Sequence, residues 1–376
     1  MPNGLRQKVY PISERLTIPM LKYLNELLLP FRTCFSRQAT FEWLVVIVIG
    51  FMLRSDHLGV TSIIRDLSLP SQRYEILIHF FRSSAWSLSS LQQTWLRVVR
   101  RSAPLLLVDH RVVLVGDGMK QTKEARRMPG VKKLHQESEN VSKGEYIFGH
   151  LFGAIGILAG TPRKWFCLPL FINLQDGIQT ILNWKKTEDE TQTPSHVVQM
   201  IEQGFEAAKA FGQALLLLDR YFLSVPALQQ LQACHLNSEV QMYLVTKAKS
   251  NVVAYERPPA KKPPPKKGES VKLKELFSNR AADFQTASVS LYGKEKRIEF
   301  FCLNLLWGQG WYQELRFVLV VHEGRHSILV STDLTLAATD IIRLYGYRFK
   351  NEPMFREMKQ VIGAFATDFG ASLCRS

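Results

Sequence analysis

The stretch RVVLVGDGMK (Arg111 to Lys120) decides the fold class, because it is an apolar run of strand length that leads into an acidic residue, Asp117. Two more runs of the same kind follow it, YIFGHLFGAIGILAG and KWFCLPLFINL. All three are rich in β-branched and aromatic residues, which favour strands. The sequence therefore predicts three consecutive strands.

Alternating helix and strand patterns come next. TPSHVVQMIEQGFEAAKAFGQ places its apolar residues near one face of a helix, and VPALQQLQACHL has a proline in the first turn of a second helix. Each is followed by a short apolar run typical of a buried strand, ALLLLDRYF and VQMYLVTKAKS respectively. The predicted order is β-β-β-α-β-α-β.

A different composition interrupts this pattern. YERPPAKKPPPKKGES (Tyr255 to Ser270) combines proline and lysine with almost no apolar residue, which predicts an extended, solvated loop. Residues 284 to 322 then resume as strands separated by glycine-containing turns, so we expect a β-rich insertion. After the strand SILVSTD, the chain ends in the helical pattern LAATDIIRLYGYRFKNEPMFREMKQVIGAF.

Residues 1 to 104 are predicted to be helical and basic, with 13 Lys and Arg against 6 Asp and Glu, a net +7. LGVTSIIRDLSLPSQRYEILIHFF predicts two short helices broken at LPS, either a pair that places a helix against DNA or an ordinary helical cap on the next domain. The apolar run from Trp43 to Leu53 has 11 residues, well short of the roughly 20 needed to cross a bilayer. It predicts a buried helix.

The charge of the whole chain indicates the class of partner. A net charge of +15 and a pI near 9.6 favour polyanions such as nucleic acid or an anionic membrane face, although a merely basic soluble enzyme is an alternative. The five cysteines show no CxxC or other short pairing, so neither a disulfide framework nor a zinc ribbon is indicated. The N-terminus lacks the apolar core of a secretory signal. We expect a cytoplasmic protein without a membrane partner.

One motif suggests zinc. His322, Glu323 and His326 have the HExxH spacing of many zinc proteases, in which a helix brings both imidazoles to one side. Here the flanking RFVLVV and SILV favour antiparallel strands, and Gly324 suits a tight hairpin turn. No histidine follows His326 as a third ligand. A zinc hydrolase is therefore a remote alternative.

Two carboxylates stand at strand ends. Asp117 follows RVVLV and Asp219 follows ALLLL. If the first three strands form a meander and the Asp219 strand packs beside the first, both carboxylates emerge near the same edge, where divalent cations could bridge them. Each alone could be a solvated cap. A site for two cations needs a third carboxylate.

The C-terminal helical pattern offers that carboxylate. The spacing Y(2)R(3)E(6)K places four polar side chains along one stripe of a helix, where the alternative is a solvated charged face. These residues are Tyr345, Arg348, Glu352 and Lys359. Pro353 fits poorly inside a helix, so we expect a kink or a restart just after Glu352.

From about residue 105 to its end, the sequence resembles the DDE transposases of bacterial insertion sequences, in the group named for this YREK signature. The resemblance implies an α/β fold with a ribonuclease H-like mixed five-stranded sheet and flanking helices, a β-rich insertion before the last catalytic helix, and an N-terminal all-helical domain. The domains expected are a probable DNA-binding domain, the first part of the catalytic core, the loop with the insertion, and the second part of the core: residues 1–104, 105–250, 251–324 and 325–376.

The resemblance also implies the chemistry. Two Mg²⁺ ions, for which Mn²⁺ could substitute, would be bound by Asp117, Asp219 and Glu352. The residues expected to contact DNA are Tyr345, Arg348, Lys359, Lys120, Arg220 and an insertion tryptophan, Trp307 or Trp311, for which a core role is the alternative. The basic segments MKQTKEARRMPGVKK and TKAKS either track the DNA backbone or are solvated loops.

The implied function is cut-and-paste DNA transposition: metal-dependent endonuclease cleavage at the ends of a mobile element, then strand transfer into target DNA. Its partners would be terminal inverted repeats and target DNA, with a homodimer in the synaptic complex on the bacterial nucleoid. The chain stops 17 residues after Lys359, in ATDFGASLCRS, where such enzymes continue as a long helix. We therefore also consider a truncated copy that only binds DNA.

Overall fold

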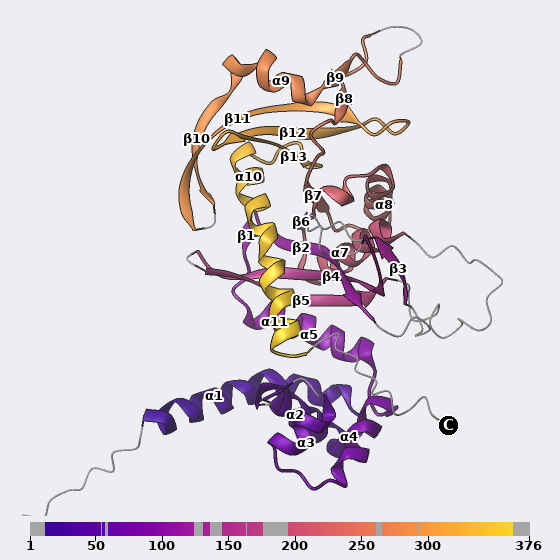
Figure 1. Ribbon diagram of the computed structural model, residues 1–376, viewed down its shortest axis with the longest axis vertical. Helices are drawn as coiled ribbons and strands as arrows, with labels where there is room; N and C mark the ends of the chain where they lie inside the picture. Colours follow the sequence, from indigo (N-terminus) through magenta and orange to yellow (C-terminus); the bar gives the residue numbers. More distant parts are fainter. Residues whose placement is uncertain are drawn as a thin grey trace, which may run out of the picture. The chain divides into compact units, whose positions relative to one another are not determined.

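The computed structural model describes residues 12–53, 55–56, 59–123, 131–135, 145–162, 164–175, 195–260, 265–291 and 293–363. The C-terminal stretch ATDFGASLCRS, and the middle of both MKQTKEARRMPGVKK and the lysine-proline loop, lie outside these ranges. The chain divides into two compact units (Figure 1). One comprises Met1–Ser102 with Met358–Ser376, and the other comprises Ala103–Glu357.

The first unit is helical, as the sequence predicts. Its N-terminal part contains α1 (Ile12–Leu28), a 3-10 turn η1 (Leu29–Cys34), α2 (Gln38–Leu53), α3 (Val60–Asp66), α4 (Arg73–Arg82) and α5 (Leu88–Ser102). The predicted break at LPS is confirmed, because α3 and α4 are separate helices. Buried Ile63 and Leu77 and the stacked rings of Phe80 and Trp86 belong to its core.

Helix α2 is less buried than its apolar sequence suggests. Gly50 packs so closely on Ile63 of α3 that an added Cβ would lie 2.6 Å from that side chain. At the end of the helix, however, Met52 and Leu53 are 57% and 64% exposed. The prediction of a helix is confirmed, but the prediction of a fully buried one is wrong for its last turn, where too few elements surround the helix to cover every face.

The second unit is built on one mixed sheet. Its first strands are β1 (Leu107–Val108), β2 (Arg111–Thr122), β3 (Lys132–His135), β4 (Tyr146–Thr161), β5 (Lys164–Leu174), β6 (Ala214–Leu217) and β7 (Met242–Lys247). The later strands are β8 (Val253–Tyr255), β9 (Ser270–Lys272), β10 (Gln285–Leu291), β11 (Lys294–Trp307), β12 (Gln313–His322) and β13 (Arg325–Ser331). The short strands β1, β3, β8 and β9 carry no periodic signal long enough for the sequence to show them.

The centre of this sheet has the order β5-β4-β2-β6-β7. Strands β2, β4 and β5 form an antiparallel meander, and β6 and β7 run parallel to β2. This is the mixed five-stranded core of a ribonuclease H-like fold, so the predicted fold class is confirmed. The sheet is larger than five strands because β13 pairs with β7, and the insertion strands continue the sheet from β13. The described residues form thirteen strands in this sheet.

Helices cover both faces of the core sheet. The remaining helices are α7 (His196–Phe211), α8 (Val225–Leu236), α9 (Leu273–Asn279), α10 (Ala338–Tyr347) and α11 (Asn351–Gln360), with 3-10 turns η2 (Arg220–Phe222), η3 (Ala281–Asp283) and η4 (Arg348–Lys350). Of these, α9 packs against the insertion strands and not on the core sheet. Gly116 of β2 and Gly156 of β4 point to opposite faces of the sheet. Met200 of α7 packs on Gly116, and Met354 of α11 packs on Gly156, so the two helices lie on opposite faces. Figure 1 shows α10 and α11 passing across the second of these faces.

The predicted C-terminal helix is interrupted by a 3-10 turn next to the candidate site residues. Helix α10 ends at Tyr347, the turn η4 follows, and α11 begins at Asn351 with Pro353 in its first turn, where proline is tolerated. The predicted interruption is confirmed. It occurs just before Glu352 and not just after it, as a 3-10 turn in which Tyr347, Arg348 and Asn351 keep right-handed helical dihedrals.

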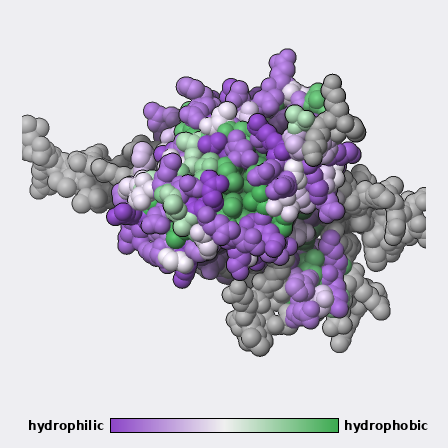
Figure 2. Space-filling view, turned by 90° about the horizontal axis from the view of Figure 1, so that it is seen from above, coloured by the Kyte–Doolittle hydropathy of each residue, from purple (hydrophilic) through white to green (hydrophobic). Residues whose placement is uncertain are grey.

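None of the described helices is both long and apolar enough to cross a bilayer. The face of the molecule in Figure 2 is mostly hydrophilic, with an apolar area near its middle.

Candidate active site

Two aspartates lie near each other on neighbouring strands of the core sheet. Strands β2 and β6 are parallel, and Val115 pairs with Leu217. Asp117 and Asp219 each follow two residues later, so they lie at matching positions of the two strands. The prediction that both stand at strand ends is wrong for Asp117, because β2 continues to Thr122 in its pairing with β4, whereas Asp219 lies beyond the end of β6. The negative charge of Asp219 is near enough to raise the pKa of Asp117. The predicted approach of these two carboxylates is thus present in the fold.

Asp117 is held by three donors. Its Oδ1 accepts a hydrogen bond of 2.8 Å from the backbone N–H of Gly118. Its Oδ2 accepts one of 2.7 Å from Nδ2 of Asn351 and lies 3.5 Å from Nη1 of Arg348. Burial raises the pKa of the Asp117 carboxyl, and the hydrogen bond from Asn351 and the charge of Arg348 only partly offset this effect.

Asp219 is fixed by the turn that follows it. Its Oδ1 accepts a hydrogen bond of 2.8 Å from the backbone N–H of Tyr221, so it caps η2. Its carbonyl oxygen accepts one of 2.7 Å from Oγ1 of Thr246 on β7. Both the strand and the cap therefore determine where this carboxylate lies.

Basic side chains lie close to one another near Asp117. Burial lowers the pKa of Lys247, and the positive charges of Arg220 and Arg348 lower it further. These three cations, from β7, η2 and η4, thus lie near one another, and Arg348 among them contacts Asp117. A concentration of cations near acidic groups suits a substrate that carries phosphates.

Glu352 is placed differently from the two aspartates. It is exposed in the first turn of α11, next to Asn351, whose side chain is the one that reaches Asp117. Within the described ranges, no group of three or more His, Cys, Asp or Glu side chains is arranged to hold a metal ion. The fold brings Asp117 and Asp219 together with Arg348, but it does not complete a three-carboxylate group with Glu352.

The other residues predicted to contact DNA have varied surroundings. The guanidinium of Arg348 lies 4.7 Å from the ring centre of Phe349 and 6.0 Å from that of Tyr345. Lys120 is exposed and donates a hydrogen bond of 2.6 Å to the carbonyl of His135. Lys359 lies in the last turn of α11, and burial lowers its pKa.

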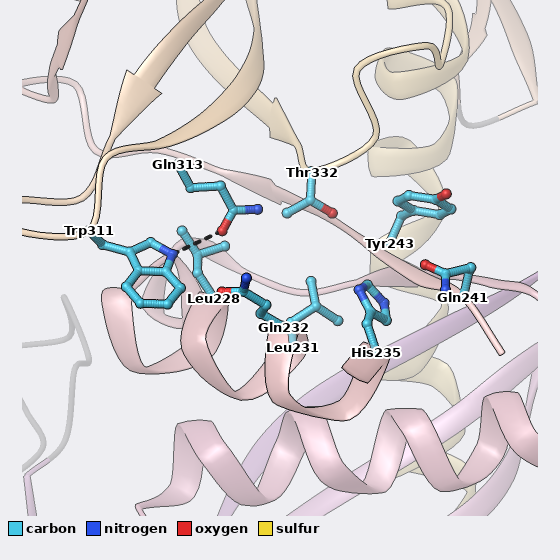
Figure 3. Close-up of a pocket in the computed structure, with 9 residues that line it drawn as sticks. All are labelled: Leu228, Leu231, Gln232, His235, Gln241, Tyr243, Trp311, Gln313 and Thr332. Atoms are coloured by element: carbon cyan, nitrogen blue, oxygen red, sulfur yellow. Dashed lines mark hydrogen bonds between the residues drawn. The ribbon is translucent and has the colours of Figure 1, made fainter. Parts of the chain in front are cut away.

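The two insertion tryptophans lie at the end of β11 and in the segment between β11 and β12. Trp307 ends β11 and packs against the core of the insertion. Trp311 donates a hydrogen bond of 3.2 Å to Gln313 and lines a cavity of about 510 Å³ (Figure 3). Gln241, which also lines this cavity, precedes β7, whereas Asp219 follows the parallel strand β6. Trp311 lies beside Leu228 at one end of the cavity, and Gln241 lies at its other end (Figure 3).

The HExxH motif forms a hairpin turn. His322 pairs with Arg325, and Glu323 and Gly324 form the two-residue loop with φ of 49° and 71°, as in the turns that hairpins prefer. His326 pairs with Val321, so the two histidines point to opposite faces of the hairpin. The ring of His326 stacks on Phe277 at 4.2 Å. The zinc hydrolase alternative is therefore wrong, because the two imidazoles cannot share a metal.

Two residues near the aspartates were not predicted. Asn351 contacts Asp117 directly, and His196, at the start of α7, packs where a side chain at Gly118 would lie. The ring of His196 also contacts Phe222 of η2, 5.2 Å away. Burial lowers the pKa of His196 to about 4, and the charges of Lys132 and Lys120 contribute. No sequence spacing links either residue to a strand end, so no pattern could have identified them.

Comparisons with known proteins agree with this geometry. A family model described as DDE superfamily endonuclease matches residues 30–297, which is more than half of the chain. A search of curated proteins finds no match.

Proposed function

The chain belongs to the DDE superfamily endonucleases, and from this premise we propose that it is a DNA transposase of the YREK group. In this proposal it cleaves the ends of an insertion sequence and joins the freed 3′-hydroxyl to target DNA. The observation that carries the proposal is the pair Asp117 and Asp219 at matching positions of parallel strands, with Arg348 in contact with Asp117. Members of this family act on DNA, which fits this arginine and the chain's net charge of +15.

Two of the three expected donors suit a hard divalent cation. Asp117 and Asp219 offer carboxylate oxygens, the donors that Mg²⁺ prefers, and endonucleases of this superfamily generally depend on divalent metals. We assign Glu352 as the third carboxylate and two Mg²⁺ ions as the cofactor, with Mn²⁺ as a substitute. When bound, such ions would activate the attacking oxygen and stabilise the leaving one.

The remaining residues bind the substrate in this proposal. Arg348, Lys247 and Arg220 neutralise phosphates next to the bond that is cut, because their charges lie near one another and Arg348 contacts Asp117. We keep Tyr345, Lys359, Lys120 and Trp307 as further DNA contacts. A homodimer would bring two inverted repeats together for synapsis.

Cleavage of DNA that carries the flanking inverted repeats tests the proposal. Asp117→Asn, Asp219→Asn and Glu352→Gln should each abolish Mg²⁺-dependent cleavage while binding in a gel shift persists. Glu357→Gln is the matched control, since Glu357 is also exposed on α11 and should cleave as the wild type does. Cleavage retained in all three variants would overturn the assignment.

A second candidate function is DNA binding without cleavage. It is favoured by one observation, that exposed Glu352 forms no metal-holding group with the two aspartates. The wild-type protein would then shift end DNA in a gel but would not nick it with Mg²⁺ or Mn²⁺. Nicking by the wild type would exclude this candidate.

A further inference from the structure

Asn351 is almost fully buried, with 1% of its surface exposed, and its Nδ2 lies 2.7 Å from Oδ2 of Asp117. We propose that Asn351 is a positioning residue that fixes the Asp117 carboxylate in the orientation in which it binds a cation. This inference rests on the proposed function, because it assigns Asn351 a role in the same metal site. It concerns affinity for the cation and not the chemical step.

The orientation of the Asn351 amide follows from its partner. An ionised carboxylate can only accept hydrogen bonds, so the NH₂ group must face Asp117. The other amide atom, Oδ1, is buried and has no hydrogen-bond partner in the described part of the chain. The side chain therefore makes its single protein hydrogen bond to Asp117.

Helix capping does not explain the residue. Asparagine is common at the start of helices, where its side-chain oxygen accepts a hydrogen bond from a backbone N–H one turn on. Asn351 has helical dihedrals, with φ of −74° and ψ of −27°, and its Oδ1 accepts no hydrogen bond from the residues that the structure describes. Its position at the start of α11 points the amide at β2 and not back at its own helix.

The contacts of Asp117 leave limited room for a cation. A carboxylate offers about four acceptor positions. Gly118 occupies one of them, Asn351 a second, and Arg348 approaches a third at the longer distance of 3.5 Å. About one acceptor position of the carboxylate then remains for a cation. The hydrogen bond from Asn351 is the shortest side-chain contact, so it has the largest effect on the direction in which that acceptor position points. Groups that orient metal ligands in this way typically change metal affinity or activity 10- to 100-fold when they are replaced.

The break in the last helix explains how Asn351 reaches Asp117. The turn η4 separates α10 from α11, and Met354, one turn into α11, packs against the sheet where a side chain at Gly156 would lie. This packing fixes the first turn of α11 over β2 and β4. Met354 therefore offers a matched control, because it anchors the same helix without touching Asp117.

Titration of the full chain with Mn²⁺ alone, without DNA, followed by electron paramagnetic resonance of the free ion, tests the proposal. Asn351→Leu keeps the volume and removes the donor, and Asn351→Ala removes it without adding bulk in case the leucine variant does not fold. Either variant should bind Mn²⁺ about 10- to 100-fold more weakly. The Mn²⁺ midpoint for cleavage of end DNA should move by the same factor, with the maximal rate at saturating Mn²⁺ largely recovered.

Three outcomes would overturn the proposal, and they separate it from the proposed function. If the wild type binds Mn²⁺ and cleaves while the Asn351 variants bind Mn²⁺ equally well, the positioning role is wrong and the proposed function stands. If Met354→Ala weakens Mn²⁺ binding as much as Asn351→Ala, packing of α11 is responsible and not the hydrogen bond. If the wild type neither binds Mn²⁺ nor cleaves, the proposed function fails and this inference fails with it.

Discussion

Asp117 and Asp219 each lie two residues after a directly paired couple, Val115 and Leu217, on two parallel strands, so their like charges lie near each other. Such a pair is unfavourable unless other groups compensate. Arg348, Asn351 and the backbone N–H of Gly118 do so for Asp117. Two adjacent acids at this place lower the free energy of unfolding, as is common at functional sites.

Removing one of these charges should stabilise the protein in the absence of divalent cations. Asp219→Asn keeps a side-chain oxygen that can cap η2 and removes the repulsion from Asp117. We expect the free energy of unfolding to rise by about 1 kcal/mol. Urea unfolding in EDTA measures it. Asp283→Asn, at an exposed aspartate paired with Arg280, is the control and should not stabilise; an Asp219→Asn variant no more stable than the wild type would contradict the prediction.

Arg348 should contribute to DNA binding as a phosphate contact. It lies 3.5 Å from Asp117 and is one of three cations that lie near one another. We expect Arg348→Ala to reduce the slope of log affinity against log salt concentration by about 1 and to weaken binding on all sequences alike. Gel shifts on end DNA at several salt concentrations measure the slope. The matched control is Arg356→Ala, at an exposed position on α11, and an equal loss in both variants would show a general charge effect.

His196 should make the protein less stable in weak acid. Burial lowers the pKa of His196 from 6.5 to about 4. Above pH 6.5 the imidazole is neutral in both states; as the pH falls from 6.5 to about 4, the unfolded chain gains a proton that the folded chain does not, so stability is lost. Because the ring is partly exposed, we expect a loss of about 1 to 2 kcal/mol across this window.

Urea unfolding between pH 4 and 7 measures that loss. His196→Phe, similar in shape but unable to titrate, should flatten the pH dependence. Lys132→Gln removes a nearby positive charge that lowers the pKa of His196, so it should reduce the dependence in part. An unchanged slope in His196→Phe would mean that other groups are responsible.

The HExxH motif should have no role in cleavage. His322 and His326 point to opposite faces of the β12–β13 hairpin, and Lys296 pairs with Glu323 at 2.6 Å, which lowers the pKa of that glutamate. We expect the double variant His322→Gln, His326→Gln to keep the wild-type rate of cleavage with Mg²⁺. Metal analysis should find no stoichiometric zinc in either protein. Loss of both zinc and activity in the double variant would restore the zinc hypothesis.

Much of the fold could be predicted from local patterns. The runs that begin at Arg111, Tyr146 and Lys164 are strands, and the helical patterns after them are helices, because burial of apolar side chains imposes a period of two or of 3.6 on the chain. The hairpin at Glu323 and Gly324 was also predictable, because a glycine between two β-branched runs readily adopts the positive φ that a tight hairpin turn requires.

The site was predictable only where the end of an apolar run marked it. Asp117 and Asp219 stand out because each follows an apolar run, and the order of the strands brings them together. Neither Asn351 nor His196 follows an apolar run, so the sequence does not single them out. They approach Asp117 and Gly118 from helices far away in the sequence, and only packing across the sheet decides which side chain of a helical turn points inward.

The sequence by itself determined the elements, their order and two of the acids, because these depend on interactions between residues close in the chain. Only the tertiary structure decided that Asn351, and not its neighbour Glu352, contacts Asp117, and that the sheet runs on through β13 into the insertion. Both depend on where a helix or strand end is fixed against distant partners. The turn η4 sets the rotation of α11 before Glu352, and a shift of one residue turns a helix by about 100°, enough to exchange an exposed side chain for a buried one.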